Sequence, residues 1–124
     1  MKYIGKHSDQ YHKYRDFSEK EAEVYLKKKG YKILERNLRI GYLEMDLIAE
    51  KDKTIVFVEV KRRENLDYGE PENFIDKKKI DKLKNFAKIY LSMKNQYDDY
   101  DVRFDVIGMS NGVLKHIEDA FRES

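Results

Sequence analysis

Two apolar runs, Met45–Ala49 and Ile55–Val60, constrain the fold of this chain most strongly. In the second run, apolar residues occupy both sets of alternating positions, which is typical of a strand that is buried on both faces. The polar stretch between the runs suits a tight turn centred on Asp52 and Lys53. The two runs therefore predict a hairpin of buried strands.

The register of this hairpin would gather four ionisable residues into one patch. A tight turn places Asp46 opposite Glu59. It also places Glu44 opposite Lys61, and alternation then puts both pairs on the same face. One interpretation is a pair of cross-strand ion pairs on a solvated face. We favour a functional site, because charges on strands that are buried on both faces are costly unless they are paired or bind a metal.

Two carboxylates beside one ammonium group are typical of a site that hydrolyses phosphodiesters with a divalent metal ion. Carboxylate oxygens are ligands that Mg²⁺ prefers, and a bound ion activates water. Asp46 and Glu59 are therefore the candidate metal ligands, and Lys61 is the candidate residue that orients or activates the water. The expected cofactor is Mg²⁺, for which Mn²⁺ can substitute.

The patterns along the rest of the chain predict an α/β domain in which helices flank a mixed sheet. The expected elements are a helix at 18–29, strands at 32–39, 43–49 and 54–61, a helix at 74–93, and strands at 102–109 and 113–117. Asn111 and Gly112 predict a two-residue hairpin turn before the last strand. We expect residues 1–16 to form a polar N-terminal arm and residues 17–124 to form a single domain.

The hairpin segments Glu44–Ala49 and Val56–Lys61 resemble those of the YraN-type family of predicted nucleases. That family is placed in the restriction-endonuclease-like fold, whose active site is an Asp followed by a Glu-x-Lys triplet. The resemblance covers about residues 17 to 121 and includes Gly30–Asn37, Gly69–Pro71, Arg103–Ile107 and Ala120–Phe121. The chain departs from the family at Ser18 and Leu43, where the family usually has glycine. Neither departure removes a candidate ligand.

The resemblance implies a metal-dependent nuclease that hydrolyses phosphodiester bonds in DNA, with branched or repair-related substrates among the candidates. It also implies a fourth catalytic residue, Glu19, on the first helix near the metal. Glu19 has a structural alternative, because Asp16 and Glu19 fit a capping box at a helix start. The alternative function for the chain is a non-catalytic nucleic-acid-binding module of the same fold.

Basic residues near the triplet are candidates to bind the nucleic-acid backbone. Arg63 follows the triplet, and Lys77, Lys78 and Lys79 lie near the start of the second expected helix. Guanidinium and ammonium groups bind phosphates well. Ordinary ion pairing for Arg63 and a solvated helix face for the lysines are the alternatives. We expect His116 to be a structural histidine outside the site.

Composition limits the remaining classes. A chain of 124 residues supports one domain with one core. The absence of cysteine excludes disulfides, zinc–thiolate sites and cysteine nucleophiles. We expect a cytoplasmic protein without a membrane partner, because neither a transmembrane run nor a signal-peptide core is present. The expected partner is nucleic acid, DNA rather than RNA, and an exposed helix face or edge strand would allow a homodimer.

Overall fold

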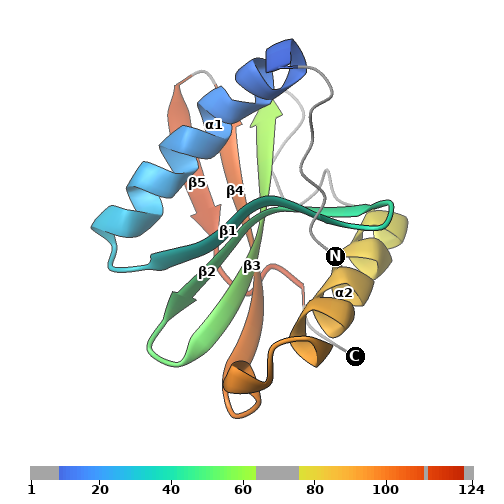
Figure 1. Ribbon diagram of the computed structural model, residues 1–124. Helices are drawn as coiled ribbons and strands as arrows, with labels where there is room; N and C mark the ends of the chain where they lie inside the picture. Colours follow the sequence, from blue (N-terminus) through green and yellow to red (C-terminus); the bar gives the residue numbers. More distant parts are fainter. Residues whose placement is uncertain (1–8, 64–75, 111, 122–124) are drawn as a thin grey trace.

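The computed structural model describes residues 9–63, 76–110 and 112–121; within the first range it describes the side chains of residues 18–62. The elements in chain order are α1 (Asp9–Lys28), β1 (Lys32–Ile40), β2 (Leu43–Lys51), β3 (Thr54–Arg63), α2 (Lys77–Ser92), the short 3₁₀ helix η3 (Asn95–Tyr97), β4 (Asp101–Ser110) and β5 (Val113–Ile117). Figure 1 shows the strands crossing between the two long helices. Neither long helix is apolar enough to span a membrane within the described part of the chain.

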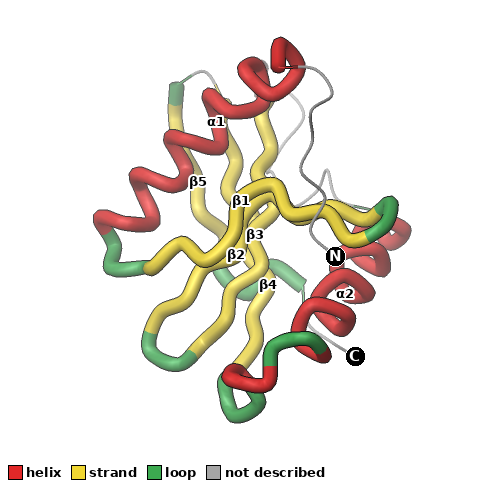
Figure 2. Tube along the Cα trace, viewed as in Figure 1, coloured by secondary structure: helices red, strands yellow, loops and turns green. Residues whose placement is uncertain are grey.

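The five strands form one mixed sheet in the order β1-β2-β3-β4-β5. Neighbouring strands are antiparallel except β3 and β4, which are parallel. A parallel connection needs a crossover, and the chain between β3 and β4 contains α2. Figure 2 shows α1 and α2 on different sides of the strands, so the predicted α/β fold with a mixed sheet and flanking helices is confirmed.

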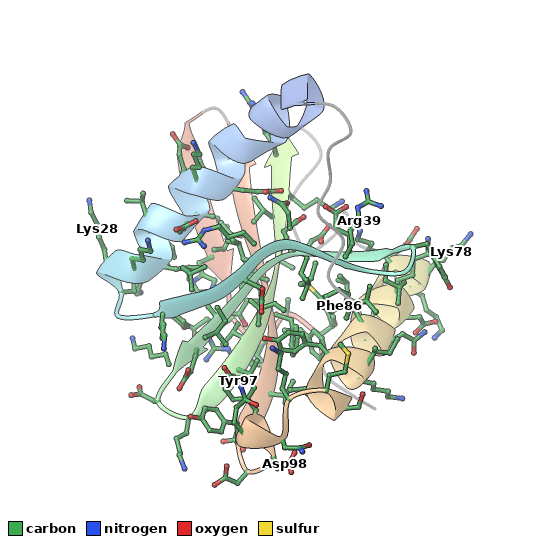
Figure 3. All side chains as sticks on the ribbon, viewed as in Figure 1. Lys28, Arg39, Lys78, Phe86, Tyr97 and Asp98 are labelled. Atoms are coloured by element: carbon green, nitrogen blue, oxygen red, sulfur yellow. The ribbon has the colours of Figure 1, made fainter. Side chains whose placement is uncertain are left out.

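Each face of the sheet packs against one helix. The core on the α2 side contains Leu38, Leu43, Met45, Ile48, Ile55, Phe57, Leu83, Phe86, Ala87, Tyr90 and Phe104. The core on the α1 side contains Ala22, Leu26, Tyr31, Leu47, Ala49, Val56, Val58 and Ile107. Strand β3 contributes alternately to both cores, as expected for a strand that is buried on both faces. Figure 3 shows Phe86 between α2 and the sheet.

The β2–β3 hairpin has the predicted register. Asp52 and Lys53 form the turn with left-handed φ values of 51° and 61°, which suits a tight hairpin. The paired residues run from Lys51–Thr54 at the turn to Leu47–Val58. Beyond that last pair the two strands separate, just before Asp46 and Glu59.

The β1–β2 ribbon changes faces at Asn37 and Asp46. Arg36 binds Glu23 of α1, but Leu38 packs in the core on the α2 side. On β2, Leu47 lies in the α1-side core, whereas Met45 lies in the α2-side core. Residues two apart normally share a face, so alternation is interrupted at this point. Asn37 has a φ of 48°, a left-handed conformation that accounts for the interruption.

Two predicted boundaries need correction. Helix α1 begins at Asp9, not at Ser18, so residues 9–16, the part of the expected polar arm that the structure describes, are helical. Asp16 therefore lies within the helix, and the capping-box interpretation of Glu19 is wrong. Helix α2 begins at Lys77, with Asp76 as its N-cap. Residues 64–75, where a long loop was predicted, lie outside the described residues.

Candidate functional site

Glu59 of β3 lies in a cluster of two lysines. Its side chain is buried, with the residue 6% exposed. Lys61 Nζ lies 3.8 Å and Lys79 Nζ 3.6 Å from the same carboxylate oxygen, Oε2. Ile55 and Phe57 pack on the α2 side of the sheet, so alternation along β3 places Glu59 and Lys61 on that side too. The fold therefore brings a lysine of α2 to the predicted Glu-x-Lys triplet.

Asp46 of β2 reaches the backbone of the same triplet. It is only 3% exposed, and its Oδ2 accepts a hydrogen bond of 2.8 Å from the backbone N–H of Val60. Val60 lies between Glu59 and Lys61, beyond the last β2–β3 pair. The carboxylate thus binds a β3 backbone donor where the ladder between the strands has ended. This contact fixes Asp46 beside the Glu-x-Lys triplet.

The two carboxylates fit a magnesium site that substrate and water would complete. Mg²⁺ is usually bound by one or two protein carboxylates together with waters and substrate phosphates. Asp46 and Glu59 supply two hard oxygen donors on adjacent, buried strands. Among the described residues, no group of three or more His, Asp or Glu side chains could hold a metal ion. Two carboxylates from adjacent strands match the way in which proteins usually hold Mg²⁺ or Mn²⁺, and this role stays a prediction.

Glu44 does not occupy the place that simple alternation predicts. Pairing between β2 and β3 ends before this residue, so it lies outside the paired part of the hairpin. Its partner in the sheet is Arg39 of β1, and the carboxylate lies 3.5 Å from the Arg39 guanidinium. The change of face at Asp46 explains why Glu44 does not join Asp46, Glu59 and Lys61 in one patch.

Glu19 lies on the inner side of α1 and is 6% exposed. It lines a cavity of about 410 Å³ together with Lys20, Glu23, Val24, Arg36, Asn37 and Leu47. Leu47 follows Asp46 on β2, and Asn37 marks the change of face on β1. Glu19 therefore faces a cavity whose wall includes a neighbour of Asp46, although Asp46 does not line it. A metal-binding or catalytic role for Glu19 stays a prediction.

The predicted phosphate-binding residues have different surroundings. Lys77 is highly exposed and lies 3.5 Å from Asp81 on its own helix. Lys78, which is labelled in Figure 3, is exposed and lies in the first turn of α2. Lys79 instead contacts Glu59, a position that sequence patterns alone could not indicate. The Arg63 backbone pairs with Ser110 on β4, and its side chain lies outside the described residues.

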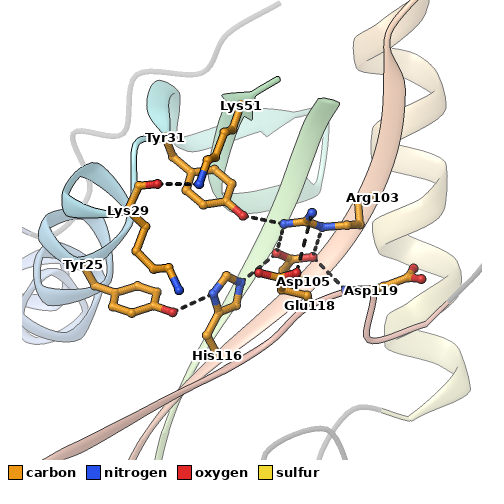
Figure 4. A network of polar contacts seen from close by, with 9 residues as sticks. All are labelled: Tyr25, Lys29, Tyr31, Lys51, Arg103, Asp105, His116, Glu118 and Asp119. Carbon is orange, nitrogen blue, oxygen red and sulfur yellow. Dashed lines mark hydrogen bonds and ion pairs between the residues drawn. The ribbon is translucent and has the colours of Figure 1, made fainter. Parts of the chain in front are cut away.

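A second buried polar cluster surrounds Asp105 on β4 (Figure 4). Both oxygens of this carboxylate accept hydrogen bonds from Arg103, at 2.8 and 2.9 Å. His116 Nε2 lies 2.7 Å from Oδ2, and the backbone N–H of Asp119 donates to Oδ1 at 3.0 Å. Tyr25 of α1 contacts the other ring nitrogen of His116 at 2.9 Å. The cluster joins α1, β4 and β5, as expected for a structural histidine.

The electrostatics of this cluster favour an ionised Asp105. Burial acts to raise the pKa of Asp105, but the hydrogen bonds from His116 and Arg103 outweigh burial and lower it. The hydrogen bond to Asp105 in turn raises the pKa of Arg103. Sequence reasoning did not single out Asp105, although a signal was present: it is a charged residue between the apolar residues Phe104 and Val106.

The mixed sheet, with a helix on each face and an Asp and a Glu-x-Lys triplet on neighbouring strands, places the chain in the restriction-endonuclease-like class of α/β folds. The chain belongs to the family described as uncharacterised protein family UPF0102, whose profile matches residues 18–109. This agrees with the YraN-type resemblance seen in the sequence.

Several relatives align over most of their length. A UPF0102 protein of Thermodesulfovibrio yellowstonii is 47% identical over 103 residues, covering 83% of this chain and 90% of the relative. A UPF0102 protein of Persephonella marina is 45% identical, covering 83% and 88%. A third, from Clostridioides difficile, is 42% identical, covering 86% and 94%. The similarity therefore extends over nearly the whole of each relative.

Proposed function

We propose that this chain is a metal-dependent nuclease that hydrolyses phosphodiester bonds in DNA. The observation that carries the proposal is the contact between Asp46 Oδ2 and the Val60 N–H, 2.8 Å long. It joins one buried carboxylate to the backbone between a second buried carboxylate and a lysine. Two acidic groups beside an amine are suited to hold a divalent cation, orient a water and stabilise charge on a phosphate.

Each residue of the site would have a distinct chemical role. Asp46 and Glu59 would hold Mg²⁺ or Mn²⁺, which lowers the pKa of a bound water and neutralises negative charge on the scissile phosphate. Lys61 would orient the water that attacks phosphorus, and Glu19 would support the ion from α1. The water oxygen forms a new bond to phosphorus, one ester P–O bond breaks, and the leaving oxygen takes up a proton. No covalent intermediate with the protein is needed.

Basic residues beside the site support a nucleic-acid substrate. Lys77 and Lys78 are exposed on the first turn of α2, the helix whose Lys79 contacts Glu59. Ammonium groups on one helix end can bind successive phosphates of a strand. The net charge is only +2, so this local cluster rather than the whole surface would direct binding. Branched or repair-related DNA is proposed as the substrate only by analogy with other proteins of this fold.

One observation favours the alternative, a non-catalytic nucleic-acid-binding module. Glu59 has two lysine amines within 4 Å, an arrangement that also satisfies a buried carboxylate without any metal. In that case the lysines would serve as permanent partners of Glu59, and the surface of α2 would bind nucleic acid without cleavage.

Cleavage assays with an isosteric variant separate these functions. Purified protein is incubated with single-stranded, duplex, flap and four-way DNA in Mg²⁺ or Mn²⁺, next to Asp46→Asn. The amide keeps an acceptor for the Val60 N–H but lacks the charge that binds a metal. The exposed Asp98→Asn change is the control. We expect loss of cleavage in Asp46→Asn alone; equal cleavage by all three proteins would refute the proposal.

A further inference from the structure

Lys79 enters the candidate site from a separate element. Its amine is 3.6 Å from Glu59 Oε2, the oxygen that also lies 3.8 Å from the amine of Lys61. The Lys79 side chain is 40% exposed and that of Lys61 26%, whereas the Glu59 side chain is only 7% exposed. Two amines thus share one buried oxygen and both keep access to solvent. The two amines therefore compete for the same carboxylate oxygen.

The backbone that carries Lys79 is held in place. The Asp76 side chain caps α2 and accepts a hydrogen bond of 2.9 Å from the backbone N–H of Lys79. Further along α2, Leu83, Phe86 and Tyr90 are buried against the sheet. The first turn of α2 is therefore fixed relative to β3, and only the flexible lysine stem determines which anion the amine contacts.

We propose that Lys79 is a second lysine of the reaction centre, which binds the scissile phosphate when a divalent ion occupies Glu59. This inference rests on the proposed nuclease function. A cation held by Glu59 would repel nearby ammonium groups and would compete with them for the carboxylate. The amine of Lys79 would then be released from Glu59, and its 40% exposed side chain would be available to a phosphate oxygen of a bound strand. Lys61 orients the water, and Lys79 stabilises charge on the phosphate.

The neighbouring lysines of α2 do not share these features. Lys77 is 88% exposed at its side chain and is paired with Asp81. Lys78 is also exposed, and such positions fit general binding to the nucleic-acid backbone. Lys79 alone among these three has a contact with Glu59 among the described side chains. Its loss should therefore change the chemistry, whereas loss of an outer lysine should change only affinity for DNA.

This role predicts opposite effects on metal binding and cleavage. In the protein without DNA, Lys79 competes with the metal for Glu59, so Lys79→Ala should bind Mn²⁺ more tightly, by about two- to fivefold for a partly exposed ion pair. With DNA, the same variant lacks a cation at the phosphate, and its cleavage rate should fall on the order of 100-fold. A residue that only supported the fold would not strengthen metal binding.

The test compares Lys79→Ala and Lys79→Arg with the control Lys88→Ala, which removes an exposed lysine from the same helix. Calorimetry with Mn²⁺ measures metal affinity without DNA, and single-turnover cleavage at saturating DNA measures the chemical step. We expect the arginine variant to recover part of the rate, and the control to match the unmodified protein in both assays.

The outcomes separate this inference from the proposed function. If the unmodified protein shows no cleavage that depends on Asp46, the proposed function is wrong and the role of Lys79 falls with it. If cleavage depends on Asp46 but Lys79→Ala cleaves like Lys88→Ala, only the inference is overturned. Unchanged or weaker Mn²⁺ binding by Lys79→Ala would overturn it as well, because the amine would then not compete at Glu59.

Discussion

Replacing Asp105 tests whether the buried cluster on the α1 side of the sheet holds the domain together. This residue is fully buried and accepts hydrogen bonds from Arg103, His116 and the Asp119 backbone. Asp105→Ala would leave a guanidinium, an imidazole and a backbone N–H without their shared acceptor. Breaking a buried ion pair by removing one partner costs about 3–5 kcal/mol.

The structure places the expected cost at the lower end of that range. The Arg103 side chain is 24% exposed and also lies 3.9 Å from Glu118, which is itself 54% exposed at its side chain. The guanidinium can therefore turn toward solvent and Glu118 after the substitution. We expect Asp105→Ala to lower the free energy of unfolding by about 3 kcal/mol at pH 7.

Urea unfolding followed by circular dichroism measures this loss. The control is Asp101→Ala, an exposed carboxylate on the same strand, which should change stability by less than about 0.5 kcal/mol. A loss of less than about 1 kcal/mol for Asp105→Ala, the size expected for a surface pair, would show that the cluster does not stabilise the fold in the way argued.

The pH dependence of the free energy of unfolding gives a second test of the Asp105 cluster. The pKa of Asp105 is lowered from its ordinary value of 3.8 in the folded protein. Its stabilising effect is therefore fully present above about pH 4 and is lost as the pH falls through the folded pKa. The stability difference between the unmodified protein and Asp105→Asn should shrink in acid. A difference that stays constant down to pH 3 would contradict the assignment of an ionised Asp105.

Four further predictions concern the site and its surroundings. Asp46→Ala should abolish cleavage with its circular dichroism spectrum retained, and Lys61→Ala should slow cleavage without weakening Mn²⁺ binding; cleavage by Asp46→Ala would assign the activity elsewhere. The hydrogen bond from Arg36 lowers the pKa of Glu23 to about 2, so the stability that Glu23→Gln removes, about 1 kcal/mol after solvent screening, should be lost between about pH 4.5 and 2 in an acid titration. Asn37→Val should destabilise the protein by at least about 1 kcal/mol more than Asn37→Gly in urea, because glycine adopts the left-handed φ of 48° at this position much more readily than a β-branched residue does; equal losses would contradict that reason.

Local sequence signals account for the parts of the fold that were predicted correctly. The Asp52–Lys53 turn and the apolar runs beside it fix the β2–β3 register, because a short hairpin leaves few alternatives. The connection between β4 and β5 follows the same rule, since Ser110 pairs with Val113 and only two residues lie between them in the chain. In both cases the residues that determine the structure are neighbours in the chain.

Features that depend on distant contacts could not be predicted in the same way. Helix α1 extends back to Asp9 although its first half shows no clear apolar period. Binding of the DNA backbone by Lys79 stays a prediction; its contact with Glu59 could not be predicted, because that contact depends on where α2 packs against the sheet. Hydrophobic periodicity describes one element at a time, whereas the contact between Lys79 and Glu59 joins two elements.

Asp46 and Asp105 show why a buried charge is a strong signal with two meanings. Each is an acidic residue between two apolar neighbours in a strand, so the sequence pattern alone gives them the same interpretation. The contacts differ: both oxygens of Asp105 accept hydrogen bonds from a guanidinium, which neutralises it within the protein. Asp46 instead binds a neutral backbone N–H where two strands separate. The guanidinium contacts identify Asp105 as a structural residue, whereas the catalytic role of Asp46 stays a prediction that the cleavage assays test.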